Sequence, residues 1–216
     1  LKTLNGNTKI NLQLAPNASC FIVFNAERRT LPSYNITKGT KSHEVSSPWT
    51  LSFPEKWGAP DSVKMNKLIS WTDHTDDGIK YFSGTATYKN SFDISRESLT
   101  KDSVIKINLG EVLDVARIFI NGKSAGVVWT PPFSLNIKDY LKPGKNTVEI
   151  QITNMWINRL TGDMNSIDGK KYCQTNIPYG RKDRFPNENG DEKFHVQRAG
   201  MIGPVRIEEI ETALKK

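Results

Sequence analysis

A group of aromatic and polar residues in the second half of the chain has the composition of a sugar-binding surface. Its members are Trp129, Asn154, Trp156, Asn158, Arg159 and Asp163. The face of a Trp ring can stack on the apolar C–H face of a pyranose. Amide, guanidinium and carboxylate groups can form hydrogen bonds with its hydroxyls. If a strand continues through them, Asn154, Trp156 and Asn158 lie on one side, because strand side chains alternate. We therefore take the six as candidate ligand-binding residues.

The same residues also have a purely structural interpretation. Trp is common in the core of β-sandwiches, where its large apolar surface is buried. Arg159 and Asp163 could form an ion pair that only holds the fold together. The two interpretations differ in where they place Trp156. A sugar platform requires an exposed ring in a concave surface, whereas a core residue is buried.

Residues for bond-breaking chemistry are not apparent, and we nominate no catalytic residue. The three histidines, His43, His74 and His195, are isolated from one another in the sequence. No G-x-S-x-G nucleophile motif is present. Glycoside hydrolysis needs two carboxyl groups across a cleft, but nothing in the sequence selects such a pair.

The acidic segment DHTDDG at residues 73–78 resembles the start of a calcium-binding loop. Asp73, Asp77 and Gly78 fit the first, fifth and sixth positions of an EF-hand loop. Thr75 is a poor third ligand, the twelfth position is Gly84, and no helix is predicted on either side. We expect no cofactor and name no metal-binding residue. Two interpretations of this segment stay open, an ordinary acidic turn and a loop that holds a structural calcium ion.

Composition limits the class of protein. The 216 residues are 37% hydrophobic, enough for one core with or without an appendage. The net charge of +7 is spread along the chain, so no nucleic-acid partner is predicted. No apolar run is long enough to span a bilayer. Cys20 lies in the apolar run SCFIVF and is expected to be a buried thiol, while a bridge to Cys173 stays open.

Alternating apolar residues predict many short strands and no helix. Strands are expected at 8–14, 20–24, 49–53, 68–71, 81–92, 104–109, 115–120, 127–129, 133–137, 148–152 and 203–210. Asn121-Gly122 predicts a type I′ hairpin, because both central positions require positive φ. This pattern is typical of an all-β protein, and we predict an antiparallel β-sandwich.

The chain is predicted to divide near residue 45. Residues 1–45 are interpreted as the terminal hairpin of a preceding β-domain, followed by a polar linker, and residues 46–216 as the main domain. Residues 164–193 are polar and rich in Gly and Asn, which indicates a long excursion. The chain does not begin with Met and shows no signal peptide. We expect it to be a piece of a longer protein.

Several motifs together resemble a known family. SGTATYKNSFDI at 83–94 and the strands and hairpin of 109–153 are similar to the sugar-binding jelly-roll domain of β-galactosidase and β-glucuronidase relatives. The closer resemblance is to the C-terminal part of α-L-rhamnosidase-like glycoside hydrolases. In those enzymes N-x-W-x-N-R-L-x-G-D follows the closing strand and the chain ends near G-P-V. Here these motifs are residues 154–163 and 203–205.

The resemblance implies a galactose-binding-domain-like jelly roll that supports the active site of a polysaccharide-degrading enzyme. It also implies that the catalytic acids lie in a barrel domain of the same polypeptide, which becomes the expected partner beside carbohydrate. Such enzymes are typically exported, so a periplasmic or secreted location is expected. The expected function is an ancillary, sugar-binding or active-site-supporting domain. The alternative is a structural domain that docks on the barrel without binding sugar.

Overall fold

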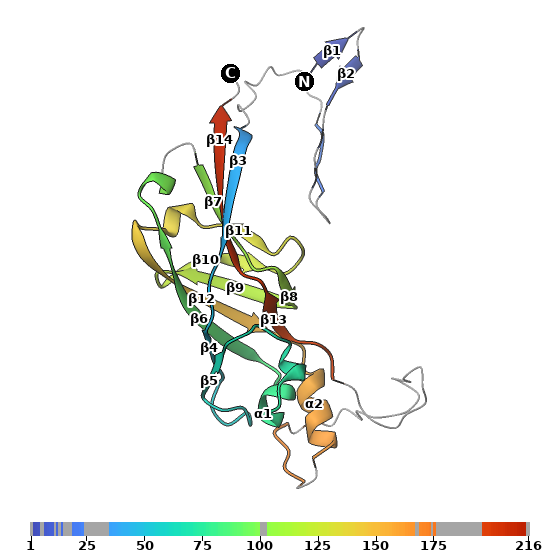
Figure 1. Cartoon of the computed structure of the whole chain (residues 1–216). Coiled ribbons are helices and arrows are strands. Elements are labelled where there is room, and N and C mark those ends of the chain that lie inside the picture. Colours follow the sequence, from blue (N-terminus) through green and yellow to red (C-terminus); the bar gives the residue numbers. More distant parts are fainter. Residues whose placement is uncertain are drawn as a thin grey trace.

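Two antiparallel sheets form the body of the protein (Figure 1). The computed structural model describes residues 2–4, 7–10, 12, 14, 19–23, 35–99, 103–166, 169–173, 175 and 196–214. The larger sheet has the order β10 (Lys123–Val128), β9 (Val115–Ile120), β12 (Gly144–Thr153), β6 (Thr85–Ile94), β4 (Trp49–Ser52) and β5 (Ser62–Met65). The prediction of an all-β antiparallel sandwich is confirmed.

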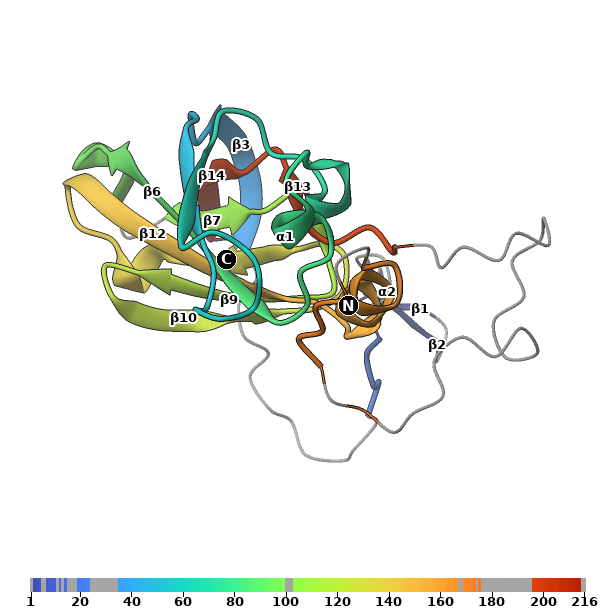
Figure 2. The same ribbon diagram turned by 90° about the horizontal axis from the view of Figure 1, so that it is seen from below.

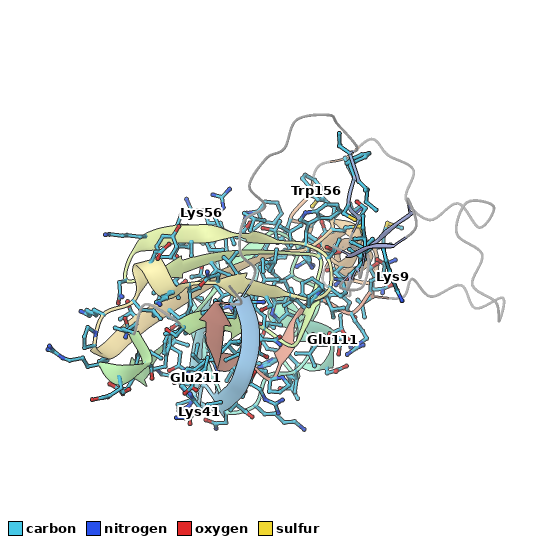
Figure 3. All side chains as sticks on the ribbon, turned by 90° about the horizontal axis from the view of Figure 1, so that it is seen from above. Lys9, Lys41, Lys56, Glu111, Trp156 and Glu211 are labelled. Carbon is cyan, nitrogen blue, oxygen red and sulfur yellow. The ribbon has the colours of Figure 1, made fainter. Side chains whose placement is uncertain are left out.

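The second sheet has four strands in the order β11 (Ser134–Asn136), β7 (Ser103–Asn108), β14 (Arg206–Leu214) and β3 (Asn35–Glu44). Two short two-stranded ladders are also present in the described residues. The short ladders join β13 (Gly200–Gly203) to β8 (Glu111–Leu113) and β1 (Lys2–Leu4) to β2 (Asn7–Lys9). Figure 3 shows Lys41 and Glu211 together on the paired strands β3 and β14, with Trp156 away from them.

Strand alternation places an apolar core between the sheets. Along β9, Ala116, Ile118 and Ile120 are fully buried, while Val115 and Arg117 are exposed. The same alternation occurs in β12, which pairs with both β6 and β9. Both strands therefore contribute one apolar face to the core, as their sequences predicted.

The core ends in a cluster of aromatic rings. Phe53, Trp71 and Phe82 meet edge to face, with ring centroids 4.8–6.2 Å apart. The indole Nε1 of Trp71 donates a hydrogen bond of 2.6 Å to the hydroxyl of Tyr88. Burial raises the pKa of Tyr88 to about 12. This cluster closes the sandwich at the end that carries the helices.

The predicted hairpin is confirmed in detail. Asn121 and Gly122 have φ values of 51° and 77°, and Lys123 pairs with Ile120 across the turn. The Asn121 amide donates to the carbonyl oxygen of Tyr140 at 2.9 Å. The turn is thus fixed by backbone conformation and by a side-chain contact to a neighbouring loop.

Helices are the main departure from the predicted secondary structure. Within the described part of the chain there are α1 (Asp77–Lys80) and α2 (Ile157–Met164), and three 3₁₀ turns, η1 (Trp71–Asp73), η2 (Glu97–Leu99) and η3 (Lys138–Tyr140). Both α-helices lie at one end of the sandwich (Figures 1 and 2). The side chains that α2 buries are mainly polar, so the apolar period that signals a helix is missing. None of the helices in the described residues has the length and apolar character needed to cross a bilayer.

The N-terminal predictions also need correction. Residues 35–44, expected as linker, form β3 and pair with β14, because main-chain pairing at a sheet edge needs no apolar pattern. Residues 19–23 form no strand, and the N-terminal hairpin instead pairs β1 with β2. Cys20 is exposed rather than buried, since no described strand of the sandwich covers it, and both cysteines are free thiols. The division into two domains near residue 45 stays a prediction.

A strand was also expected at 68–71, and that prediction is wrong. The chain turns there into η1, whose first residue is Trp71. The Ser70 hydroxyl accepts a hydrogen bond from the backbone N–H of Thr72, which favours a turn over an extended strand. Most of the predicted 164–193 excursion lies outside the described residues, as does His195.

Candidate functional site

The candidate residues lie where β12 leaves the sheet and α2 begins. The strand ends at Thr153 and the helix starts at Ile157, with Trp156 as its N-cap residue. Asn154, Trp156 and Asn158 therefore do not share one face of a continued strand, and that expectation is wrong. The strand stops there because the Asn154 side chain bonds the backbone of Phe82 and Gly84, and the chain then turns into α2.

Asn154 joins the end of β12 to the start of β6. Its Oδ1 accepts a hydrogen bond from the backbone N–H of Gly84, and its Nδ2 donates to the carbonyl oxygen of Phe82, both at 2.9 Å. The side chain is 7% exposed. Both ends of the amide are therefore used inside the protein.

Asn158 performs the same role for the C-terminal segment. Its Nδ2 donates to the carbonyl oxygen of Gln197, and its Oδ1 accepts from the Gln197 N–H, both at 2.7 Å. Asn158 is buried within α2. The pair of hydrogen bonds fixes α2 against the chain that leads into β13.

Arg159 and Asp163 form a buried ion pair that orders residues 172–173. The Arg159 Nε and the Asp163 Oδ1 are 3.0 Å apart, and each side chain is 6% exposed. The second carboxylate oxygen accepts from the N–H groups of Tyr172 at 3.0 Å and Cys173 at 2.7 Å. The Arg159 guanidinium lies 4.5 Å from the centre of the Tyr172 ring. The carboxylate thus serves the cation and two backbone donors together.

The two candidate tryptophans are exposed, contrary to a role in the core. Trp129 is 70% exposed and Trp156 is 63% exposed. The candidate set therefore separates into four buried polar side chains that bind their own chain and two open indole rings. A role of any of the six in ligand binding stays a prediction.

Trp156 forms one wall of a cavity of about 230 Å³, which we call the tryptophan cavity. It is lined by Pro54, Trp57, Phe82, Ser83, Gly84, Thr85, Trp156, Arg159 and Cys173. Trp129 is not among these residues. Burial and the nearby Asp163 carboxylate raise the pKa of the Cys173 thiol, which keeps it in the neutral form.

A larger cavity of about 430 Å³ lies on the other side of Arg159 and was not predicted. We call it the tyrosine cavity, and it is lined by Gly58, Asp77, Gly78, Tyr81, Arg159, Gly162, Asn165, Ser166, Lys170 and Tyr172. These residues come from three separate segments of the chain. No local spacing could reveal them, although the glycines at 58, 78 and 162 were a signal that backbones approach closely.

The acidic turn contributes to α1. The Asp76 carboxylate accepts from the N–H of Ile79 and caps the helix, and His74 Nδ1 accepts from the N–H of Asp76. Across the described residues, no three His, Cys, Asp or Glu side chains converge as a metal site would require. A structural calcium ion at this turn stays an untested alternative to an ordinary acidic turn.

Comparisons with known proteins identify relatives of this fold. A Formosa agariphila protein described as a "Putative beta-glucuronidase" is 32% identical over 177 residues, which is 76% of this chain and 15% of that protein. The structure of a rhamnosidase from Novosphingobium sp. PP1Y matches with a TM-score of 0.70 at 31% identity, over 86% of this chain and 16% of that chain. No family model matches.

A more distant match shows the fold alone. The β-glucuronidase of an uncultured Clostridium sp. has a TM-score of 0.53 at 20% identity, over 85% of this chain and 31% of that chain. The chain thus spans between 15% and 31% of the length of these relatives. Its structural neighbours are a rhamnosidase and β-glucuronidases, as the sequence motifs predicted, and the match is that of a β-sandwich domain of such a glycoside hydrolase.

Proposed function

We propose that the chain is an ancillary domain of a rhamnosidase-like glycoside hydrolase that contacts carbohydrate through the tryptophan cavity. The observation that carries the proposal is the 63% exposed indole of Trp156 at the edge of a cavity also lined by Trp57. An exposed ring beside a recess offers a pyranose its apolar face, which is the usual way in which aromatic side chains bind sugars. The catalytic carboxylates belong, in this proposal, to another part of the same polypeptide.

The buried polar side chains that flank Trp156 in the sequence supply rigidity in this function. Asn154 and Asn158 fix the two ends of the segment that holds Trp156, and the Arg159–Asp163 pair fixes the first turns of α2. A platform that is already ordered loses little conformational entropy when a ligand binds. Hydrogen bonds to sugar hydroxyls would then come from lining groups such as the hydroxyl of Thr85, which is also 2.8 Å from the Thr153 hydroxyl and keeps capacity for a further bond.

Calorimetric titration of the chain with oligosaccharides that end in rhamnose, galactose or glucuronate tests the proposal. Trp156→Ala should lower the affinity about fivefold, because stacking on an aromatic ring contributes roughly 1 kcal/mol. Its free energy of unfolding should change by less than about 0.5 kcal/mol, since the ring is exposed.

Trp129→Ala is the matched control, because Trp129 is equally open but lies outside the tryptophan cavity. Its affinity should equal that of the wild type. Equal affinities for all three proteins would contradict a role for the Trp156 indole in sugar binding.

A second candidate function is docking on the rest of the enzyme without sugar contact. It is favoured by two exposed methionines, Met155 beside Trp156 and Met164 at the end of α2, which are 55% and 48% exposed. In this case hydrogen exchange of residues 155–164 should be slower in the full-length enzyme than in this chain, with no change when sugar is added. A periplasmic or secreted location is part of the proposal, and fractionation of cells that make the full-length enzyme tests it.

A further inference from the structure

We propose that the tyrosine cavity is a separate carbohydrate subsite that takes one neutral pyranose unit. The inference rests on the proposed function only for the class of ligand, since its residues and its cavity differ from those around Trp156. Arg159 is the one lining residue that the two cavities share. The volume of about 430 Å³ is within the roughly 300–1,000 Å³ typical of small-molecule sites.

The walls of the cavity are held together by close backbone contacts. A Cβ atom at Gly58 would come within 2.7 Å of the Tyr172 ring, and one at Gly78 would overlap the carbonyl oxygen of Gly58. Only glycine permits the loop before β5, the first turn of α1 and the segment after α2 to meet in this way. The recess is therefore formed by three segments that already contact one another without a ligand.

Arg159 acts as a positioning residue for one wall. Its guanidinium lies over the Tyr172 ring, and its partner Asp163 holds the Tyr172 backbone N–H. The positive charge of Arg159 is compensated by Asp163 at 3.0 Å. The wall is thus oriented by a charge pair that adds no net charge to the recess.

The remaining polar groups suit a ligand with many hydroxyls. Among the described residues, the Asp77 carboxylate and the Asn165 amide have no side-chain hydrogen-bond partner, and both side chains are exposed. A carboxylate accepts and an amide both donates and accepts, so together they can bind neighbouring hydroxyls of one sugar ring. The half-buried rings of Tyr81 and Tyr172 add apolar surface and phenolic hydroxyls.

The charges of the lining favour a neutral ligand. Among the described residues, Asp77 adds a negative charge without a partner, whereas the Lys170 ammonium is engaged within the chain, 5.0 Å from the centre of the Tyr172 ring. A uronate would be repelled by the Asp77 carboxylate. A neutral pyranose can instead donate charge-assisted hydrogen bonds from its hydroxyls to Asp77. We therefore assign the site to a neutral unit, such as a deoxyhexose or hexose.

Titration of the chain with methyl rhamnoside, methyl galactoside and glucuronate, followed by amide NMR and calorimetry, tests the assignment. Neutral pyranosides should shift the amide signals of Gly58 and Gly78. Asp77→Ala should weaken the affinity for them about tenfold, because a charge-assisted hydrogen bond is lost. Glucuronate should bind at least about threefold more weakly than the neutral pyranosides.

Asp139→Ala is the matched control, since Asp139 occupies the first turn of η3 as Asp77 occupies the first turn of α1 and does not line the cavity. Its affinity should equal that of the wild type. An unchanged affinity in Asp77→Ala, or tighter binding of glucuronate than of the neutral sugars, would overturn the assignment.

The two proposals fail separately. If Asp77→Ala weakens binding and Trp156→Ala does not, the tyrosine cavity is supported and the tryptophan cavity is rejected. If only Trp156→Ala weakens binding and the Gly58 and Gly78 signals do not move, the tyrosine cavity is rejected and the proposed function stands. An absence of heat and of NMR shifts with every sugar would reject both cavities as sugar sites.

Discussion

The sandwich core and the α2 end are built from different interactions. Between the sheets, side chains such as Ile118 and Ile150 are fully buried among other apolar groups. In α2, Asn158, Arg159 and Asp163 are buried and each binds backbone or a charged partner, while the buried hydroxyl of Thr161 has no hydrogen-bond partner among the described residues. The core gains free energy from any close-packed apolar group, whereas the α2 end depends on particular partners. We therefore expect substitutions by other apolar residues to be tolerated in the core of this protein, and substitutions of the buried polar residues around α2 to be tolerated less well.

The largest effect should come from the aromatic end of the core. Trp71→Ala removes a fully buried indole and leaves the Tyr88 hydroxyl without the indole donor. The free energy of unfolding should fall by about 3–5 kcal/mol. Chemical denaturation measures it, and the loss should appear as one cooperative transition at a lower midpoint.

The exposed Trp129 provides the control for this experiment. Trp129→Ala should change the free energy of unfolding by less than about 0.5 kcal/mol. A loss below about 1 kcal/mol in Trp71→Ala would show that the aromatic cluster does not hold the two sheets together.

The second largest effect should be a loss of stability that is confined to the α2 end. Asp163→Ala leaves the Arg159 cation buried without its partner and removes the acceptor of two backbone N–H groups. Loss of one partner of a buried pair costs about 3 kcal/mol. Hydrogen exchange should become faster in residues 157–166 and 169–173, while the amides of β9 and β12 keep their protection.

Glu111→Ala is the control for the buried pair. It breaks the exposed Arg198–Glu111 pair, whose side chains are 58% and 46% exposed. Its effect on stability should be below about 1 kcal/mol. If Asp163→Ala instead lowers the protection of all strands equally, the α2 end and the core are a single cooperative unit, and the contrast between them fails.

The smallest effect should be a pH dependence of the core. Burial raises the pKa of Tyr88 from 10.0 to about 12. A raised pKa means that the unfolded chain loses the phenolic proton first, so the contribution is complete below pH 10 and declines between pH 10 and about 12. At pH 11 the loss should be about 1.4 kcal/mol.

Comparison of the wild type with Tyr88→Phe isolates this contribution, because the other tyrosines are common to both proteins. The difference between their free energies of unfolding, measured from pH 8 to 11.5, should shrink above pH 10. A constant difference would mean that Tyr88 ionises in the folded protein as it does in the unfolded chain.

The contrast between the two regions also explains which predictions succeeded. Strand β9, the Asn121-Gly122 turn and β12 follow from local patterns, since alternation and a positive φ are properties of neighbouring residues. Helix α2 could not be predicted, because its buried face is polar and its partners are distant in sequence. Strand β3 was missed for a related reason, since its pairing with β14 depends on a sheet edge formed by the other end of the chain.

The sequence by itself determined the all-β class, the register of the central hairpin and the resemblance to rhamnosidase-like enzymes. Tertiary structure alone decided that Trp156 is exposed and Asn154 is buried, because exposure depends on which other segments pack against a residue. It also decided that Asp77 and Tyr172, 95 positions apart, line one cavity, because Gly58 lies against both Gly78 and the Tyr172 ring. A local sequence pattern predicts which face of a strand is buried, because that depends on neighbouring residues. A cavity between distant segments forms only when the folded chain brings those segments together.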